Sequence, residues 1–310
     1  MTTAAAHPSA STEQPAAALP LVAASVAVLI WGVGPLFVKA TGLPGITVAT
    51  YRLWFAIPVM YVILRIGGGR LTWPIIKVAA PAGALFAVDI GLGFSSFNHT
   101  SIANATLIGA LTPVLVLLFA GRMFGDHLRR IDFLWFALAL AGTAIVVLAG
   151  SGGGSNSFFG DALAAGSLLA WTAYFLYVKR SRVDGVPAFA FMTAVVATAA
   201  VAITPYALFA ADPVTAFHGT DWLWLFCLIL GPGAIGHGSM TWATRYINVN
   251  VTSLMTLAGP VVSTVGAFWW FHQTVSAAQL GGGALVLCAI AMVLAGHHST
   301  DNAPLPLEAE

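Results

Sequence analysis

One carboxylate stands inside a long apolar stretch of this 310-residue sequence, at Asp89 in the segment 84–97. An acid at the centre of a bilayer costs about 2.5–3.5 kcal/mol on insertion scales, so it normally faces a partner or a water-filled cavity. On a 3.6-residue repeat, Asp89 shares a helix face with Gly93 and Ser96. Asp89 therefore either contacts a solute or proton on a pathway through the membrane, or holds two helices together.

The second titratable group of interest is His237, in the glycine-rich segment 231–244. Histidine titrates near neutral pH, which suits proton coupling. The alternative is a buried neutral imidazole with a single hydrogen bond. In the same segment, Gly231, Pro232 and Gly233 predict a kinked or broken helix, and the backbone groups freed by such a break can contact a solute.

Two tryptophans and one arginine extend this set of candidates. Indole N–H groups are costly to bury in lipid without a partner, so Trp31 and Trp171 are expected to face inward. They either form walls of a site for a flat or apolar solute, or pack helices together. Arg52 either reaches toward the membrane interface or attracts an anionic group.

Small hydroxyl residues and prolines mark a further group of positions. Thr256 and Ser263 lie on one face of an apolar segment, where they either allow close helix approach or line a cavity. Pro35, Pro113 and Pro260 interrupt apolar segments and are hinge candidates, together with the glycines and proline of 231–233.

The elements that position these residues are membrane-spanning helices. Only 7% of the residues are charged, against about 25% in typical soluble proteins, and 59% are apolar. Lipid must therefore be the main solvent, and ten apolar windows of spanning length lie between Leu19 and Ala295. A net charge of +1 without a basic patch excludes nucleic acid as a partner. The sequence predicts an all-α integral membrane protein embedded in the lipid bilayer.

The basic residues give the orientation. Ten of the twelve Lys and Arg residues flank the connections between spans 2–3, 4–5, 6–7 and 8–9. The positive-inside rule places these connections in the cytoplasm, and with them both termini. We therefore expect a multi-pass protein of the inner (cytoplasmic) membrane.

The chain also contains an internal repeat. The segment 31–39, WGVGPLFVK, resembles 171–179, WTAYFLYVK, and 105–115 resembles 252–262 at an offset of 147 residues. Five is an odd number of spans, so the second copy enters the membrane inverted, an architecture typical of transporters. The expected boundaries are a disordered tail 1–18, a first repeat 19–150, a Gly/Ser linker 151–158, a second repeat 159–296 and a disordered tail 297–310. At the 147 offset Asp89 falls beside His237, so these two groups are predicted to act at matched depth.

The pattern as a whole resembles the EamA family of the drug/metabolite transporter superfamily. The residues that carry the resemblance are Trp31-Gly32, Lys39, Arg52, Ala105, Leu107, Pro113, Val114, Gly125, Leu128, Asp132, Pro260 and Gln279, with Asp126 and Gln273 where the family has Glu. The resemblance implies a ten-helix basket in which spans 1, 3, 4, 6, 8 and 9 line a central cavity and spans 5 and 10 are peripheral. Such proteins move small metabolites, commonly outward.

The predicted function is a secondary transporter that works by alternating access and exports amino acids or related compounds and drugs. The sequence contains no zinc-helix, Walker A or nucleophile-elbow motif, so we expect no catalytic residue, no metal and no cofactor, with proton coupling left open. The alternatives are a membrane-embedded enzyme acting on a lipid or isoprenoid, and a passive channel. The partners are the small-molecule substrate and the bilayer, and the chain is a monomer or homodimer.

Overall fold

The computed structural model describes residues 18–97, 99–100, 102–125, 129–150, 157–210, 217–272 and 274–301. Within these ranges every regular element is helical, and ten helices are long and apolar enough to cross a membrane. The prediction of an all-α protein with ten spans is therefore confirmed. Most of both predicted tails, most of the Gly/Ser linker, Asp126, Leu128 and Gln273 lie outside the described residues.

Seven spans are single helices, and three are broken. The single helices are α1 (Ala18–Thr41), α2 (Gly45–Ile66), α3 (Trp73–Phe97), α6 (Arg130–Gly150), α7 (Phe158–Val183), α8 (Ala188–Ala210) and α13 (Ala277–Asp301). The fourth span is α4 (Ile102–Gly109) and α5 (Thr112–Phe124), the eighth is α9 (Asp221–Leu228), η1 (Ile229–Gly236) and α10 (His237–Ala243), and the ninth is α11 (Val249–Met255) and α12 (Ala258–Phe271). The last helix continues through Gly296, where the boundary was expected, and ends at Asp301.

Prolines account for the breaks in the fourth and ninth spans. Pro113 has no N–H to donate to the carbonyl of Gly109, and that carbonyl accepts the Thr112 hydroxyl instead, at 2.8 Å. Pro260 occupies the equivalent place in the ninth span, three residues into α12. The two breaks therefore fall at corresponding positions of the two repeats, which places a bend in each half at the same depth.

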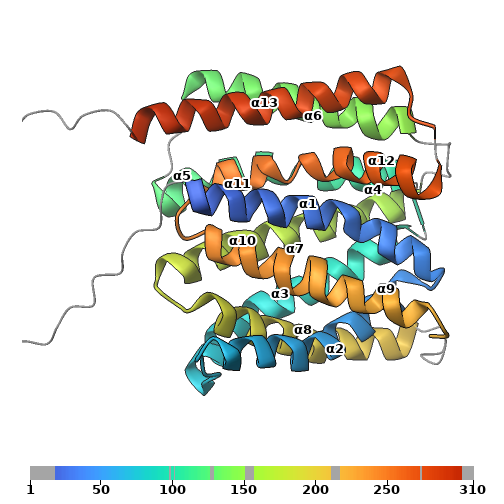
Figure 1. Ribbon diagram of the computed structural model, residues 1–310, viewed down its shortest axis with the longest axis vertical. Coiled ribbons are helices and arrows are strands. Elements are labelled where there is room, and N and C mark those ends of the chain that lie inside the picture. The colour runs from blue at the N-terminus through green and yellow to red at the C-terminus, as the bar shows by residue number, and fades with distance from the viewer. Residues whose placement is uncertain are drawn as a thin grey trace, which may run out of the picture.

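The spans form a layered bundle (Figure 1). Helices α6 and α13 pack together along one edge, and α2 and α8 along the opposite edge, with the remaining spans between them. The beginning of α1 and the end of α13 lie at the same end of the bundle, as an even number of spans requires. Spans 5 and 10 are thus peripheral, and the spans that carry Asp89, Trp31, Trp171 and His237 lie between the two edge pairs.

Glycines allow the peripheral pair to pack closely. A Cβ at Gly142 would stand 2.7 Å from the carbonyl oxygen of Gly282, and a Cβ at Gly282 would stand 2.8 Å from that of Gly142. Neither backbone could tolerate a side chain at this crossing without moving apart. The small residues therefore bring α6 of the first repeat directly against α13 of the second.

A buried acid ties the same two helices at one end. Asp132 is fully buried and accepts hydrogen bonds from the Arg129 backbone N–H (2.9 Å), Nε (3.2 Å) and Nη2 (2.8 Å). The remaining Arg129 nitrogen, Nη1, donates to the carbonyl of Gly296 at 3.1 Å. The hydrogen bonds to Asp132 raise the pKa of the Arg129 guanidinium, so this cation stays charged and links the two repeats.

Candidate functional site

A cavity of about 310 Å³ lies between the third, fourth, sixth and ninth spans. That volume is at the lower end of the roughly 300–1,000 Å³ typical of small-molecule pockets. Its described lining residues are Asp89, Gly93, Ser96, Ala105, Thr106, Gly109, Ala110, Thr112, Ala164, Ser167, Leu168, Trp171, Thr256, Leu257 and Pro260. Both repeats contribute to this lining, so the cavity lies where the two halves of the chain meet.

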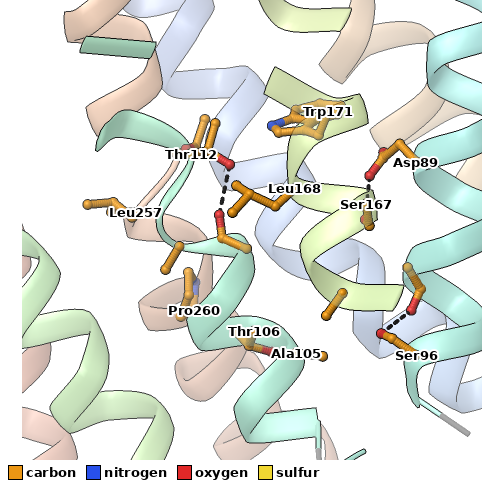
Figure 2. Close-up of a pocket in the computed structure, with 15 residues that line it drawn as sticks. Asp89, Ser96, Ala105, Thr106, Thr112, Ser167, Leu168, Trp171, Leu257 and Pro260 are labelled. Carbon is orange, nitrogen blue, oxygen red and sulfur yellow. Dashed lines mark hydrogen bonds between the residues drawn. The ribbon is translucent and has the colours of Figure 1, made fainter. Parts of the chain in front are cut away.

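Helices α3 and α7 form the polar wall of the cavity. The Ser167 hydroxyl donates to Asp89 Oδ1 at 2.7 Å, and the Ser96 hydroxyl donates to the Gly93 carbonyl at 2.6 Å. Figure 2 shows Asp89, Ser96 and Ser167 on one side of the cavity, with Leu257 and Pro260 on the other. Asp89 is the only ionisable side chain among the described lining residues. The acid identified in the sequence therefore borders a cavity instead of lipid.

The broken spans form the opposite wall. Gly109 and Thr112 flank the bend in the fourth span, while Thr256 and Pro260 flank the bend in the ninth. The Thr256 hydroxyl donates to the carbonyl of Ser253 in its own helix, at 2.6 Å. Two of the predicted hinges, at Pro113 and Pro260, thus lie at bends beside the cavity.

The two matched tryptophans differ in their surroundings. Trp171 lines the cavity, and its ring meets the Trp31 ring edge to face at 5.9 Å. Trp31 lies behind it and donates its indole N–H to the Pro232 carbonyl at 3.1 Å, which anchors α1 to η1. A Cβ at Gly236 would stand 2.6 Å from Trp31 Nε1, so glycine is needed there for the indole to approach. Of the two tryptophans, only Trp171 is among the described residues that line this cavity.

His237 does not line the cavity. It is buried at the start of α10, with ring centroids 4.8 Å from Trp31, 5.1 Å from Phe86 and 6.5 Å from Tyr174. No ion pair or hydrogen bond joins it to Asp89 among the described residues. His237 therefore lies among aromatic rings and is not itself one of the described residues that line the cavity.

The remaining candidates lie away from the cavity. Ser263 donates its hydroxyl to the Gly32 carbonyl of α1 at 2.5 Å, so it packs two helices together. Arg52 lies against η1, with Nε 3.9 Å from the point where a Cβ at Gly233 would stand. Its side chain therefore turns toward the bundle instead of reaching for the interface. Pro35 lies within the single helix α1.

Sequence reasoning missed several residues of the site. Ser167 and Thr112 line the cavity but were not singled out. Ser167 precedes Trp171 by four residues and so shares its helix face, a signal that would have identified it. Among the described residues, no group of three or more His, Cys, Asp or Glu side chains is placed to hold a metal.

Comparison with known proteins finds a matching family and several relatives of this chain. The model of the EamA-like transporter family matches residues 18–148 and 158–295, one copy in each half of the chain. The aromatic amino acid exporter YddG of Ancylobacter novellus is 29% identical over 253 residues, which cover 77% of this chain and 84% of the exporter. A probable terminal-alkyne amino-acid exporter of Streptantibioticus cattleyicolor is 24% identical over 212 residues, covering 63% of this chain and 65% of that protein.

A solved crystal structure has the same fold. It superposes with a TM-score of 0.77 at 23% sequence identity, and the alignment covers 90% of this chain and 98% of that chain. The ten-helix arrangement therefore recurs in a protein of nearly the same extent.

Proposed function

This chain belongs to the EamA-like transporter family, and we propose that it exports amino acids or closely related small solutes by alternating access. It is a multi-pass membrane transporter, and no enzyme is indicated. Two of the relatives that it resembles are named as an aromatic amino acid exporter and a probable terminal-alkyne amino-acid exporter. The proposal extends that activity to this chain.

The observation that carries the proposal is the position of the cavity. It lies at the junction of two inverted repeats, beside the bends of the fourth and ninth spans, and holds one carboxylate. Bent spans around a site between inverted repeats allow one half to rock against the other. A solute held between these spans would be exposed first to one side of the membrane and then to the other.

The ends of α7 differ in a way that fits one state of such a cycle. Its cavity residues lie between positions 164 and 171, whereas Lys179 and Arg182, near the end of the helix, are buried. Lys179 Nζ donates to the Ile247 carbonyl at 2.7 Å, and Arg182 Nε donates to the Thr241 carbonyl at 3.1 Å. These contacts hold the sixth span against the eighth span and the connection that follows it, at the end that carries most of the basic residues. We take that end, and both termini, as cytoplasmic, so the cavity lies in the outer half of the membrane.

Counterflow in proteoliposomes tests the proposal. Vesicles that contain the purified full-length chain are loaded with unlabelled L-phenylalanine, L-leucine or L-lysine, and uptake of the same labelled amino acid is followed. A carrier shows uptake above the passive level only when its substrate is loaded inside. Uptake that is independent of loading would indicate a channel, and no stimulation by any amino acid of the panel would overturn the proposed substrate class.

A further inference from the structure

Three positions on two helices make up the polar end of the cavity. Asp89 and Gly93 lie one turn apart on α3, and Ser167 faces them from α7. The Ser167 hydroxyl is committed as a donor to Asp89 Oδ1, so this oxygen is held in place. A carboxylate offers about four acceptor sites, and one serine hydroxyl occupies only one of them. The remaining acceptor sites are available to a donor that enters the cavity.

The described cavity lining carries a carboxylate but no cationic side chain. Among the described lining residues Asp89 is the only ionisable group, and there is neither a Lys nor an Arg. The other described polar side chains are the hydroxyls of Ser96, Thr106, Thr112 and Thr256 and the Trp171 indole. An anionic solute would thus meet an uncompensated carboxylate, whereas an ammonium group would meet its counter-ion. The site is therefore complementary to a cation.

We propose that Asp89 and Ser167 form a subsite for the protonated amine of the transported solute, and that Gly93 keeps this subsite open. The proposal rests on the transport function proposed above and names the group by which a solute is recognised. Asp89 accepts hydrogen bonds from the ammonium group, while Ser167 is a positioning residue that acts through Asp89. The apolar remainder of the solute lies toward Trp171, Leu257 and Pro260.

Gly93 has a specific steric role in this subsite. A Cβ at position 93 would stand 2.9 Å from the Ser167 hydroxyl oxygen and 3.6 Å from its Cβ. The first distance is too short, whereas the second is ordinary van der Waals contact. An alanine would therefore displace the Ser167 hydroxyl from Asp89 but would fit if that hydroxyl were absent. This difference makes the coupling between Gly93 and Ser167 measurable.

The inverted repeat supplies only one such subsite. Asp89 corresponds to Gly236 at the 147 offset, and Ser167 corresponds to Ala27 at the 140 offset of the tryptophan pair. In place of an acid, the Trp31 indole packs closely on Gly236. One half of the pseudo-symmetric site is thus polar, whereas the other is filled by an aromatic ring. A solute with one amine and an apolar body matches this asymmetry.

Ligand binding to the purified full-length chain in detergent tests the subsite without any transport step. 2-Phenylethylamine retains the ring and ammonium group of phenylalanine, while 3-phenylpropionate retains the ring and carboxylate. Isothermal titration calorimetry should detect binding of the amine and much weaker or no binding of the acid. An amine that does not bind, or an acid that binds equally well, would overturn the assignment.

Variants of the two polar residues extend the test. Asp89→Asn should weaken 2-phenylethylamine binding by about 10- to 100-fold, since a charge-assisted hydrogen bond is lost. Ser167→Ala should weaken it by roughly three- to tenfold, because the carboxylate is retained but is no longer held. Unchanged affinity in Asp89→Asn contradicts the subsite itself, and unchanged affinity in Ser167→Ala contradicts the positioning role.

A double-mutant cycle isolates Gly93. Gly93→Ala should weaken amine binding about as much as Ser167→Ala, and the double variant should differ from Ser167→Ala by less than about twofold. If the losses of amine affinity in Gly93→Ala and Ser167→Ala were additive in the double variant, Gly93 would affect binding by a route other than the Ser167 hydroxyl. Gly281→Ala is the matched control, because nothing lies within 4 Å of a Cβ there. Thr143→Val, which removes a buried hydroxyl bonded within α6, controls for loss of an intramembrane hydroxyl.

The two proposals fail in distinguishable ways. If the amine binds and depends on Asp89 but no amino acid shows counterflow, the transport proposal is wrong and the subsite stands. If counterflow of L-phenylalanine is saturable and survives in Asp89→Asn at the native apparent KM, the subsite is wrong and the transport proposal stands.

Discussion

Replacing Trp31 by phenylalanine removes the indole N–H that bonds to the Pro232 carbonyl in the π-helical segment of the eighth span. That hydrogen bond is 3.1 Å long and joins the first repeat to the second. Trp171 occupies the matching place in the repeat, and no hydrogen bond from its indole is found within the described residues. The same substitution at the two positions should therefore have different consequences.

The expected difference follows from what each indole contacts. In Trp31→Phe the Pro232 carbonyl loses this donor but keeps the backbone N–H of His237, so the lost hydrogen bond costs about 0.5–1.5 kcal/mol of unfolding free energy. The void left by the smaller ring adds up to about 1 kcal/mol. In Trp171→Phe no hydrogen bond is broken and one edge of the ring already faces the cavity, so the loss should stay below about 1 kcal/mol. Transport should respond in the opposite order, with a raised apparent KM in Trp171→Phe and a near-native one in Trp31→Phe.

Equilibrium unfolding in mixed detergent micelles measures the first quantity. Each variant lacks one tryptophan, so circular dichroism is a safer signal than fluorescence. Counterflow of L-phenylalanine over a range of concentrations measures the second. Equal unfolding midpoints for the two variants would refute the argument that the hydrogen bond to Pro232 stabilises the fold, and a raised KM in Trp31→Phe alone would refute the assignment of Trp171 to the cavity wall.

Three further outcomes can be checked. Gly142→Ala should lower stability by at least about 1 kcal/mol without changing the apparent KM, because its Cβ would press on the Gly282 carbonyl; native-like unfolding would contradict the close crossing. Arg182→Met removes a buried donor to the Thr241 carbonyl and so loosens the sixth span against the eighth. A single cysteine introduced near the Arg182 end of α7 should then react faster with a thiol reagent added from the cytoplasmic side. An unchanged rate would mean that this hydrogen bond does not restrict access at that end of the helix. Transport by the native chain should fall with acid, because protonation neutralises Asp89, whereas Asp89→Asn should be slow and insensitive to pH; a pH response retained in that variant would point to another proton site.

The fold could be predicted because its signals are local and repeated. Long apolar windows arise from the need to satisfy backbone hydrogen bonds in lipid, and the repeat offsets relate the two halves. The site was harder to predict. Asp89, Ser96, Trp171 and Thr256, which the sequence offered as candidates with packing as the alternative for most of them, line the cavity, as does the hinge candidate Pro260. Their partners are ordinary residues of other spans, and spacing along one helix does not show which face meets another.

The sequence by itself determined the solvent of this protein, the number of its spans, the inverted repeat and the presence of an acid that lipid would not accept. The tertiary structure alone decided which repeat-related residues keep equivalent roles. Trp31 and Trp171 have the same residue type and register, yet one anchors η1 and the other lines the cavity. His237 and Asp89 are close to equivalent positions of the repeat, yet their side chains have different surroundings. The imidazole of His237 packs among aromatic rings, whereas the carboxylate of Asp89 faces Ser167. Rotation and contact between spans depend on packing across the whole bundle, which one-dimensional periodicity does not contain.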